Sequence, residues 1–250
     1  MPRTVPFRLA AACALALLFL LWSTAIAGAK GPVVSLHVVG KGGEVLDEDS
    51  FGVGGTVSIA ASPKATCFGS GTGGSGKKLA LKGATALGML VRAAQFTAAL
   101  KPVLVTDHFA DEFGLGLCGI GGTAATSKSS WYLKVNHKVP SVGGEKVKLH
   151  AGDEVLWGYG GYPYPEDLAL VAPSSVQANV PFAVQVFSYD EKGKKKPASG
   201  ATVSGASGPT DASGHATVTL SAPAQLSARL GKDTPSAAVP VCVGGRCPGQ

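Results

Sequence analysis

The chain has 250 residues and a formal net charge of +6, and only 15% of its residues are charged. A nucleic-acid surface needs basic residues interleaved with aromatics on one face, and no such pattern occurs here, which excludes that class of partner. The 35 glycines and the low share of charge are typical of a β-rich extracellular protein.

Residues 1–27 read as a secretory signal peptide. Arg3 and Arg8 precede an uncharged apolar run over 9–22, and the small residues at 25–27 match what signal peptidase accepts. The apolar run has 14 residues, fewer than the roughly 20 that a membrane-spanning helix needs. We therefore expect a secreted protein of the cell envelope or extracellular space, with no membrane span in the mature chain.

Removal of this segment also removes Cys13 and leaves four cysteines: Cys67, Cys118, Cys242 and Cys247. An even number of cysteines in an exported chain indicates two disulfide bonds. The sequence alone allows three pairings. The simplest joins Cys67 to Cys118 and Cys242 to Cys247, so that each bond stays within one domain.

Two β-branched runs open the mature chain, at 33–39 and 55–63. Glycines and an acidic stretch separate them, which predicts an antiparallel hairpin. After a long Gly/Ser loop, a segment with helical periodicity follows Thr85, which is placed to cap its first turn. The apolar stripe of this helix predicts three core residues: Leu87, Leu90 and Val91.

The segment 129–160 carries the sharpest strand signals. From Trp131 onward, every second residue faces one way, while Tyr132, Lys134 and Asn136 face the other. Strands over 145–150 and 154–159 are expected to follow, giving three antiparallel strands with Trp131 and Trp157 in the core. Residues 32–162 are thus predicted as a β-grasp-like domain with one helix.

Three stretches, "TALGMLVRA", "WYLKVN" and "VKLHAGDEVLWGY", resemble the C-terminal domain of transcobalamin-type cobalamin carriers, a module also present in bacterial surface proteins. The resemblance covers residues 32–162 and depends on Trp131, Asn136, Gly152, Asp153 and Trp157. His137 stands where the family usually has glycine, and because a histidine at positive φ costs energy, we expect a longer or different turn. In these carriers the ligand lies between this domain and a helical barrel. No barrel precedes the domain here, so half of a cobalamin pocket is missing.

The second half begins with a Pro-rich linker at 163–167. Beyond it, short β runs recur about every ten residues, which predicts an immunoglobulin-like β-sandwich over 168–243 and a tail over 244–250. The stretch 197–220 resembles bacterial immunoglobulin-like surface domains. The expected fold class is therefore α+β followed by all-β.

The sequence contains no nucleophile elbow, zinc-helix motif or EF-hand loop, so we expect a protein that is not an enzyme and has no catalytic residues, metal site or cofactor. His37 and His215 lie in predicted strands without ligand-spaced partners, and exposed strand positions are expected for both.

Tyrosines supply the candidate binding residues, because each offers a rigid apolar ring and a hydroxyl to a sugar or a flat ligand. The tentative ligand-binding set is Tyr132, Asn136, Tyr159, Tyr162 and Tyr164. We expect a secreted, non-enzymatic binding or adhesion accessory protein of the cell envelope, whose partner is an envelope protein or glycan, or a small hydrophobic ligand. The alternative is a small-molecule carrier of the corrinoid type.

Overall fold

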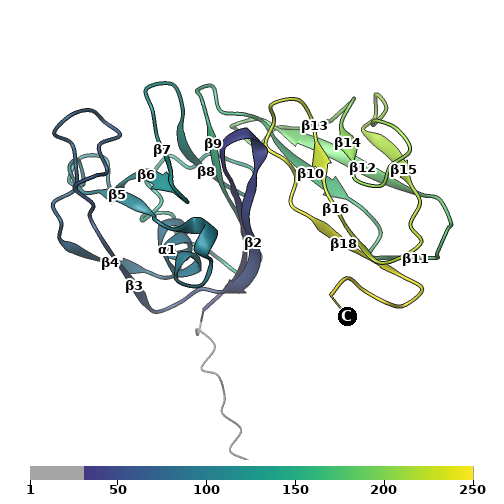
Figure 1. Ribbon diagram of the computed structural model, residues 1–250, viewed down its shortest axis with the longest axis horizontal. Helices are drawn as coiled ribbons and strands as arrows, with labels where there is room; N and C mark the ends of the chain where they lie inside the picture. Colours follow the sequence, from purple (N-terminus) through teal and green to yellow (C-terminus); the bar gives the residue numbers. More distant parts are fainter. Residues whose placement is uncertain (1–30, 250) are drawn as a thin grey trace, which may run out of the picture.

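The computed structural model describes residues 31–249, so the predicted signal peptide lies outside the described residues. The chain forms an N-terminal half (31–162) and a C-terminal half (163–249), and each half has its own hydrophobic cluster (Figure 1). Within the described part, no helix is long and apolar enough to cross a membrane.

The central sheet of the N-terminal half has four strands in the order β2 (Val45–Gly52), β1 (Val33–Val39), β9 (Glu154–Gly160) and β8 (Ser130–Val135). β1 is antiparallel to β2 and parallel to β9, and β9 is antiparallel to β8. The first strand of the half and its last strand are therefore neighbours in the middle of the sheet.

Helix α1 (Ala86–Phe96) packs into the same core as the inward side chains of this sheet. It begins after Thr85, whose hydroxyl oxygen accepts a hydrogen bond from the backbone N–H of Gly88 (3.2 Å) and so satisfies one of the free donors of the first turn. The helix and the sheet bury a common set of side chains that includes Leu87, Leu90, Val91, Trp131 and Trp157.

Two smaller sheets and two short 3-10 helices complete this half. They are β3 (Thr56–Ala60) with β4 (Lys78–Lys82), then β5 (Leu104–Thr106), β6 (Gly116–Ile120) and β7 (Thr123–Ala124), with η1 (Lys41–Gly43) and η2 (Ala98–Leu100). A disulfide between Cys67 and Cys118 ties the glycine-rich loop that follows β3 to strand β6.

The C-terminal half contains three small sheets. β12 (Phe182–Tyr189) pairs with β10 (Asp167–Val171), β13 (Lys195–Pro197) and β15 (His215–Val218). β18 (Val239–Val243) lies between β11 (Ser175–Val176) and β16 (Ala224–Leu226), and β14 (Thr202–Val203) pairs with β17 (Ala228–Arg229). The second disulfide, Cys242–Cys247, closes a short loop at the end of β18. The predicted pairing of all four cysteines is thereby confirmed.

The predicted fold class is wrong. In place of an α+β, β-grasp-like domain followed by an immunoglobulin-like sandwich, the described chain is a mostly β, all-β protein with one α-helix of 11 residues and sheets of two to four strands. Glycines and prolines divide the strands into short pieces, since neither residue suits the interior of a strand. These pieces pair in several small sheets instead of two large facing ones.

Two strand predictions are wrong, each for its own reason. The hairpin expected between 33–39 and 55–63 does not form, because the acidic stretch between them is itself the edge strand β2, while β3 pairs with β4. Charged residues are common on edge strands, where they face water. The strand expected over 145–150 is absent, because its backbone groups bond to the start of α1: Ala86 N–H donates to Val147 O (3.1 Å) and Leu149 N–H to Ala84 O (3.0 Å).

The turn at Asn136-His137 also differs from the prediction. Both residues have positive φ, 49° and 67°, and the N–H of Lys138 donates to the carbonyl oxygen of Val135 (3.1 Å). These are the features of the two-residue turn with a left-handed backbone at both central positions. The longer turn expected from the cost of a left-handed histidine is therefore wrong.

Candidate functional site

The face of the central sheet that points away from α1 carries three polar side chains and one leucine in a single row. The strand register aligns Glu48, His37, Leu156 and Lys134 across all four strands. Because side chains alternate along a strand, Tyr132 lies on the same face as Lys134. The C-terminal half covers this face, so the row is enclosed between the two halves (Figure 1).

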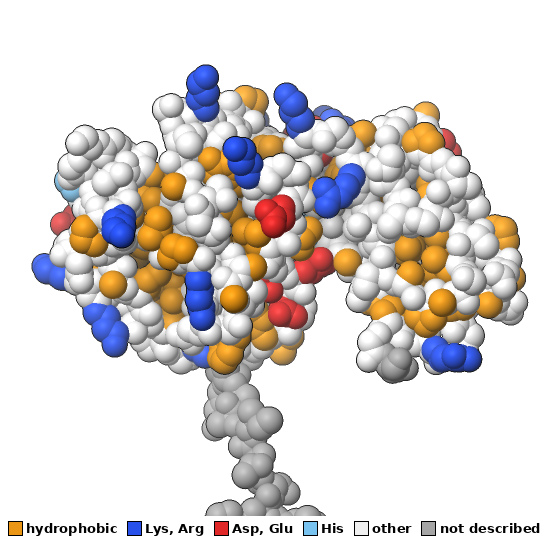
Figure 2. All heavy atoms as spheres, in the orientation of Figure 1, with side chains coloured by type: hydrophobic (Ala, Val, Ile, Leu, Met, Phe, Trp, Pro, Cys, Tyr) orange, Lys and Arg blue, Asp and Glu red, His pale blue; other side chains and the backbone are white. Residues whose placement is uncertain are grey.

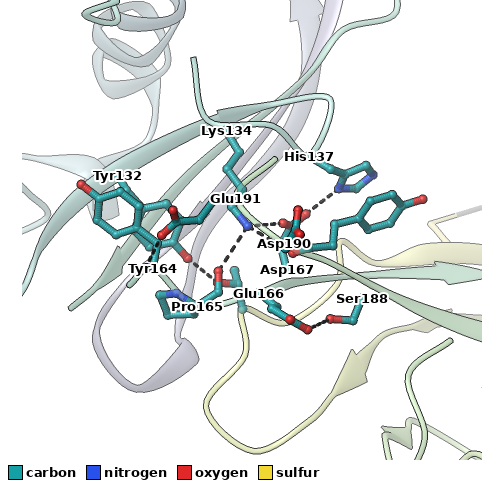
Figure 3. A network of polar contacts seen from close by, with 12 residues as sticks. Tyr132, Lys134, His137, Tyr164, Pro165, Glu166, Asp167, Ser188, Asp190 and Glu191 are labelled. Atoms are coloured by element: carbon teal, nitrogen blue, oxygen red, sulfur yellow. Dashed lines mark hydrogen bonds and ion pairs between the residues drawn. The ribbon is translucent and has the colours of Figure 1, made fainter. Parts of the chain in front are cut away.

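Lys134 is buried at this junction with no exposed side-chain surface. Its ammonium group lies 2.6 Å from Oδ1 of Asp167 and also donates to the carbonyl oxygens of Pro165 (3.2 Å) and Tyr189 (3.4 Å), as Figure 3 shows for the first two. Three acceptors thus match the three N–H groups of the ammonium. A buried ion pair of this kind is tolerated only when its remaining hydrogen-bonding capacity is satisfied.

His137 contacts the other oxygen of Asp167. Its Nδ1 lies 2.5 Å from Oδ2 of Asp167 (Figure 3). Its Nε2 lies 3.5 Å from a carboxylate oxygen of Glu154. The imidazole also stacks on the ring of Tyr189 with 3.8 Å between centroids. These contacts hold His137 in its left-handed conformation and connect the turn of one half to strands β10 and β12 of the other.

Three of the predicted tyrosines form a stack beside the ion pair. The ring of Tyr132 lies parallel to that of Tyr164, with 4.7 Å between centroids, and Tyr162 meets Tyr164 edge-on at 5.7 Å. Tyr132 is buried, and its hydroxyl forms a hydrogen bond with the hydroxyl of Thr234. Burial raises the pKa of Tyr132 to about 12. The ring of Tyr162, by contrast, is 81% exposed, so the stack presents only its outer end to solvent.

The other predicted residues lie elsewhere. Asn136 holds the turn together: its amide nitrogen donates to Asp153 (2.9 Å), and its oxygen accepts from the backbone N–H of Glu154 (2.9 Å). Tyr159 lies on the opposite face of the sheet, against the buried Trp131, and its hydroxyl donates to Ala124 O (3.1 Å). The structure therefore brings Tyr132, Tyr162 and Tyr164 together and separates Tyr159 from them. The indole of Trp157 is buried in the core.

A groove of about 610 Å³ lies next to the ion pair, between the two halves. Residues of β1, β2 and β9 line one wall, and β10 with the segment 235–240 lines the other. Figure 2 shows Asp and Glu side chains gathered beside the notch between the halves. The volume falls within the range of about 300–1,000 Å³ that is usual for small-molecule sites.

His37 lines this groove with a side chain that is only 12% exposed. Its Nε2 lies 3.2 Å from the carbonyl oxygen of Pro235, so in the neutral ring Nε2 carries the proton and Nδ1 is an acceptor. Nδ1 is buried, has no hydrogen-bond partner within the described chain, and lies 4.0 Å from a carboxylate oxygen of Glu48. Burial lowers the pKa of His37, and the negative charges of Glu48 and Asp167 oppose this shift.

Neither the groove nor the ion pair is predictable from the sequence. One signal of the ion pair was present. Lys134 lies on the same face as Tyr132 in a largely apolar strand, and its ammonium group needs either solvent or a buried partner. The partner, Asp167, is 33 residues away in the predicted linker, and no local pattern joins the two. The second wall of the groove is still more distant in sequence, since His37 meets Pro235.

Comparison with protein families finds a match to a domain of unknown function, DUF4430, over residues 106–161. This family is associated with transcobalamin-like domains, which is consistent with the resemblance over that part of the chain. The matched segment includes Lys134 and His137 but ends before Asp167. No curated protein and no solved structure matches the chain.

Proposed function

We propose that this chain is an exported, non-enzymatic binding protein of the cell envelope, and that the groove between its halves is the ligand site. The observation that supports this most directly is a groove of about 610 Å³ with one wall from each half. Small-molecule sites occur preferentially at such interfaces between structural units. The two disulfides fit an oxidising compartment outside the cytosol.

The contacts around Asp167 hold the two halves together and so support the groove between them. Asp167 uses both carboxylate oxygens, one on Lys134 and one on His137, and the His137 ring is stacked on Tyr189. These groups are committed to one another instead of being presented to a substrate. By fixing the two walls, they reduce the ordering that a ligand must impose when it binds.

Filling the groove tests this proposal. Ser50 is exposed on the edge strand β2 and lines the groove, so Ser50→Trp places an indole there without removing core packing. Native mass spectrometry of the exported protein should detect a small molecule retained by the wild type and lost from Ser50→Trp. Ser199→Trp, at an exposed position that does not line the groove, should behave as the wild type does. Identical ligand content in wild type and Ser50→Trp would contradict the proposal.

A corrinoid carrier is the second candidate, because the DUF4430 match is consistent with a transcobalamin-like domain. A corrinoid held in the groove should shift its visible spectrum and raise the melting temperature of the wild type, but not of Ser50→Trp. A spectrum and melting temperature unchanged by excess cobalamin would eliminate this candidate and leave the groove to another ligand.

A further inference from the structure

We infer that the groove binds a cationic ligand of the aliphatic amine class, whose N–H groups pair with the carboxylates of Glu48 and Glu154. The inference rests on the proposed function, because it names the ligand class of that same groove. It is carried by the charge of the groove lining, by a pair of facing acceptors and by the apolar character of the second wall.

Among the residues that the structure describes, four acidic residues and two histidines line the groove, with neither lysine nor arginine. One carboxylate, Asp167, is neutralised by Lys134 and bonded to His137. Asp49 pairs with Leu36, whose side chain belongs to the core shared with α1, so its carboxylate lies on the other face of the sheet. Glu48 and Glu154 remain. Without the predicted signal peptide, which holds Arg3 and Arg8, the chain has 20 basic and 16 acidic residues and a formal charge of +4, so the groove reverses the sign of the surrounding protein. A concave site lined by one sign of charge concentrates ligands of the opposite sign.

His37 and Glu48 face each other as two acceptors without a donor. The unpartnered Nδ1 of His37 lies 4.0 Å from Oε2 of Glu48, and the other oxygen of Glu48 already accepts the backbone N–H of Ala238. A buried acceptor that has no donor, as Nδ1 of His37 is, is costly. An ammonium group between His37 and Glu48 donates to both, whereas a carboxylate or phosphate adds a third acceptor.

The groove also contains further hydrogen-bond acceptors and an apolar wall. The hydroxyls of Ser35 and Ser50, 2.9 Å apart, lie two residues along the same strands and can accept from a second N–H group. On the opposite wall the solvent-accessible lining is largely apolar and includes Ala169, Ala237, Val239 and Pro240. A hydrocarbon chain with amino groups matches this combination of acidic and apolar surfaces.

Spermidine is a suitable probe, with the dianion adipate as an aliphatic chain of opposite charge. Calorimetric titration of the full mature chain should show binding of spermidine that weakens as salt is added, and no binding of adipate. Glu48→Gln and Glu154→Gln should each weaken spermidine binding by about three- to tenfold, since each removes one charge while keeping a similar shape. Glu112→Gln, exposed and outside the groove, should leave the affinity unchanged.

Melting temperatures establish that each variant is folded before it is titrated. Failure of spermidine to bind, or equal affinity in the wild type and the Glu48→Gln/Glu154→Gln double variant, would overturn the inference. If Ser50→Trp loses a retained ligand while spermidine does not bind the wild type, the groove is the site and only the ligand class is wrong. If Ser50→Trp keeps every ligand that the wild type binds, the proposed function fails as well.

Discussion

His37 couples the protonation state of the junction to the stability of the fold. Burial lowers the pKa of its imidazole below the ordinary value of 6.5, while the nearby charges of Glu48 and Asp167 act in the opposite direction. A histidine whose pKa falls on folding contributes stability that is fully present above its unfolded pKa. That stability is lost as the pH falls from 6.5 toward the lower folded pKa, because the unfolded chain takes up the proton first.

We therefore expect the free energy of unfolding to decrease as the pH is lowered below 6.5, and His37→Gln to make this decrease smaller. Urea denaturation at a series of pH values measures the slope. His215→Gln is the matched control, because the side chain of His215 is 48% exposed. The same slope in wild type and His37→Gln would contradict this account.

The burial of His37 could not be predicted from the sequence. The sequence indicates a strand at this histidine, and an isolated polar residue in such a strand is usually exposed. Its ring is instead enclosed by the Pro235 segment, 198 residues away. The burial of Trp131 and Trp157 is easier to predict, because their alternation with other apolar residues along the strand is a local signal.

At the scale of elements, the Cys67–Cys118 disulfide joins a long, glycine-rich loop to strand β6, and other contacts of the loop support the same arrangement. The phenyl ring of Phe68 lies over Gly116, where a Cβ would come within 2.4 Å of the ring. Asp107 accepts hydrogen bonds from the backbone N–H and the hydroxyl of Ser75 in the same loop. The disulfide closes a sequence separation of 51 residues, and that of Cys242–Cys247 is 5.

Replacing both Cys67 and Cys118 by serine should lower the free energy of unfolding by about 3–4 kcal/mol, because a long loop regains its freedom in the unfolded chain. The Cys242→Ser/Cys247→Ser pair should cost less, since it releases a much shorter loop. Equilibrium urea denaturation of both variants provides the measurement. Equal losses, or a larger loss for the C-terminal pair, would be inconsistent with the loop-closure explanation.

Local signals account for which elements are predictable. Helix α1 follows from its apolar stripe and from Thr85, all within a dozen residues, and strand β1 follows from its β-branched run. Strand β2 escapes prediction because its acidic residues read as a loop. The partner of each strand is a tertiary property: β1 pairs with β9, and no feature of either sequence specifies this.

At the scale of the whole molecule, the central sheet has a different neighbour on each face. α1 packs on one face, and the C-terminal half covers the other, so Lys134 and Tyr132 are buried between halves and not within one. Tyr132 meets Thr234 across 102 residues of sequence. This packing could not be predicted from the sequence. The alternation of side chains along a strand shows that one face of the sheet is polar, but it does not show what covers that face.

Lys134→Met should lower the free energy of unfolding by about 3–5 kcal/mol, because Asp167 is left as an uncompensated buried charge. Small-angle X-ray scattering should show a larger radius of gyration if the halves then separate. Adding Asp167→Leu to this variant should recover part of the stability, since an apolar pair can replace a buried ion pair. Lys128→Met, at an exposed position, should change stability by no more than about 0.5 kcal/mol. Wild-type stability and radius in Lys134→Met would show that the ion pair does not hold the halves together.

Strand β1 pairs in parallel with β9, from Ser35 beside Glu154 to Val39 beside Gly158. A nascent chain emerges from its N-terminus, so β1 is made long before this neighbour exists. Until residue 158 has emerged, β2 is the only strand that can pair with β1, and the sheet lacks the β9 side. The N-terminal half thus remains open through most of its own synthesis, which leaves a chaperone time to hold the chain before it closes.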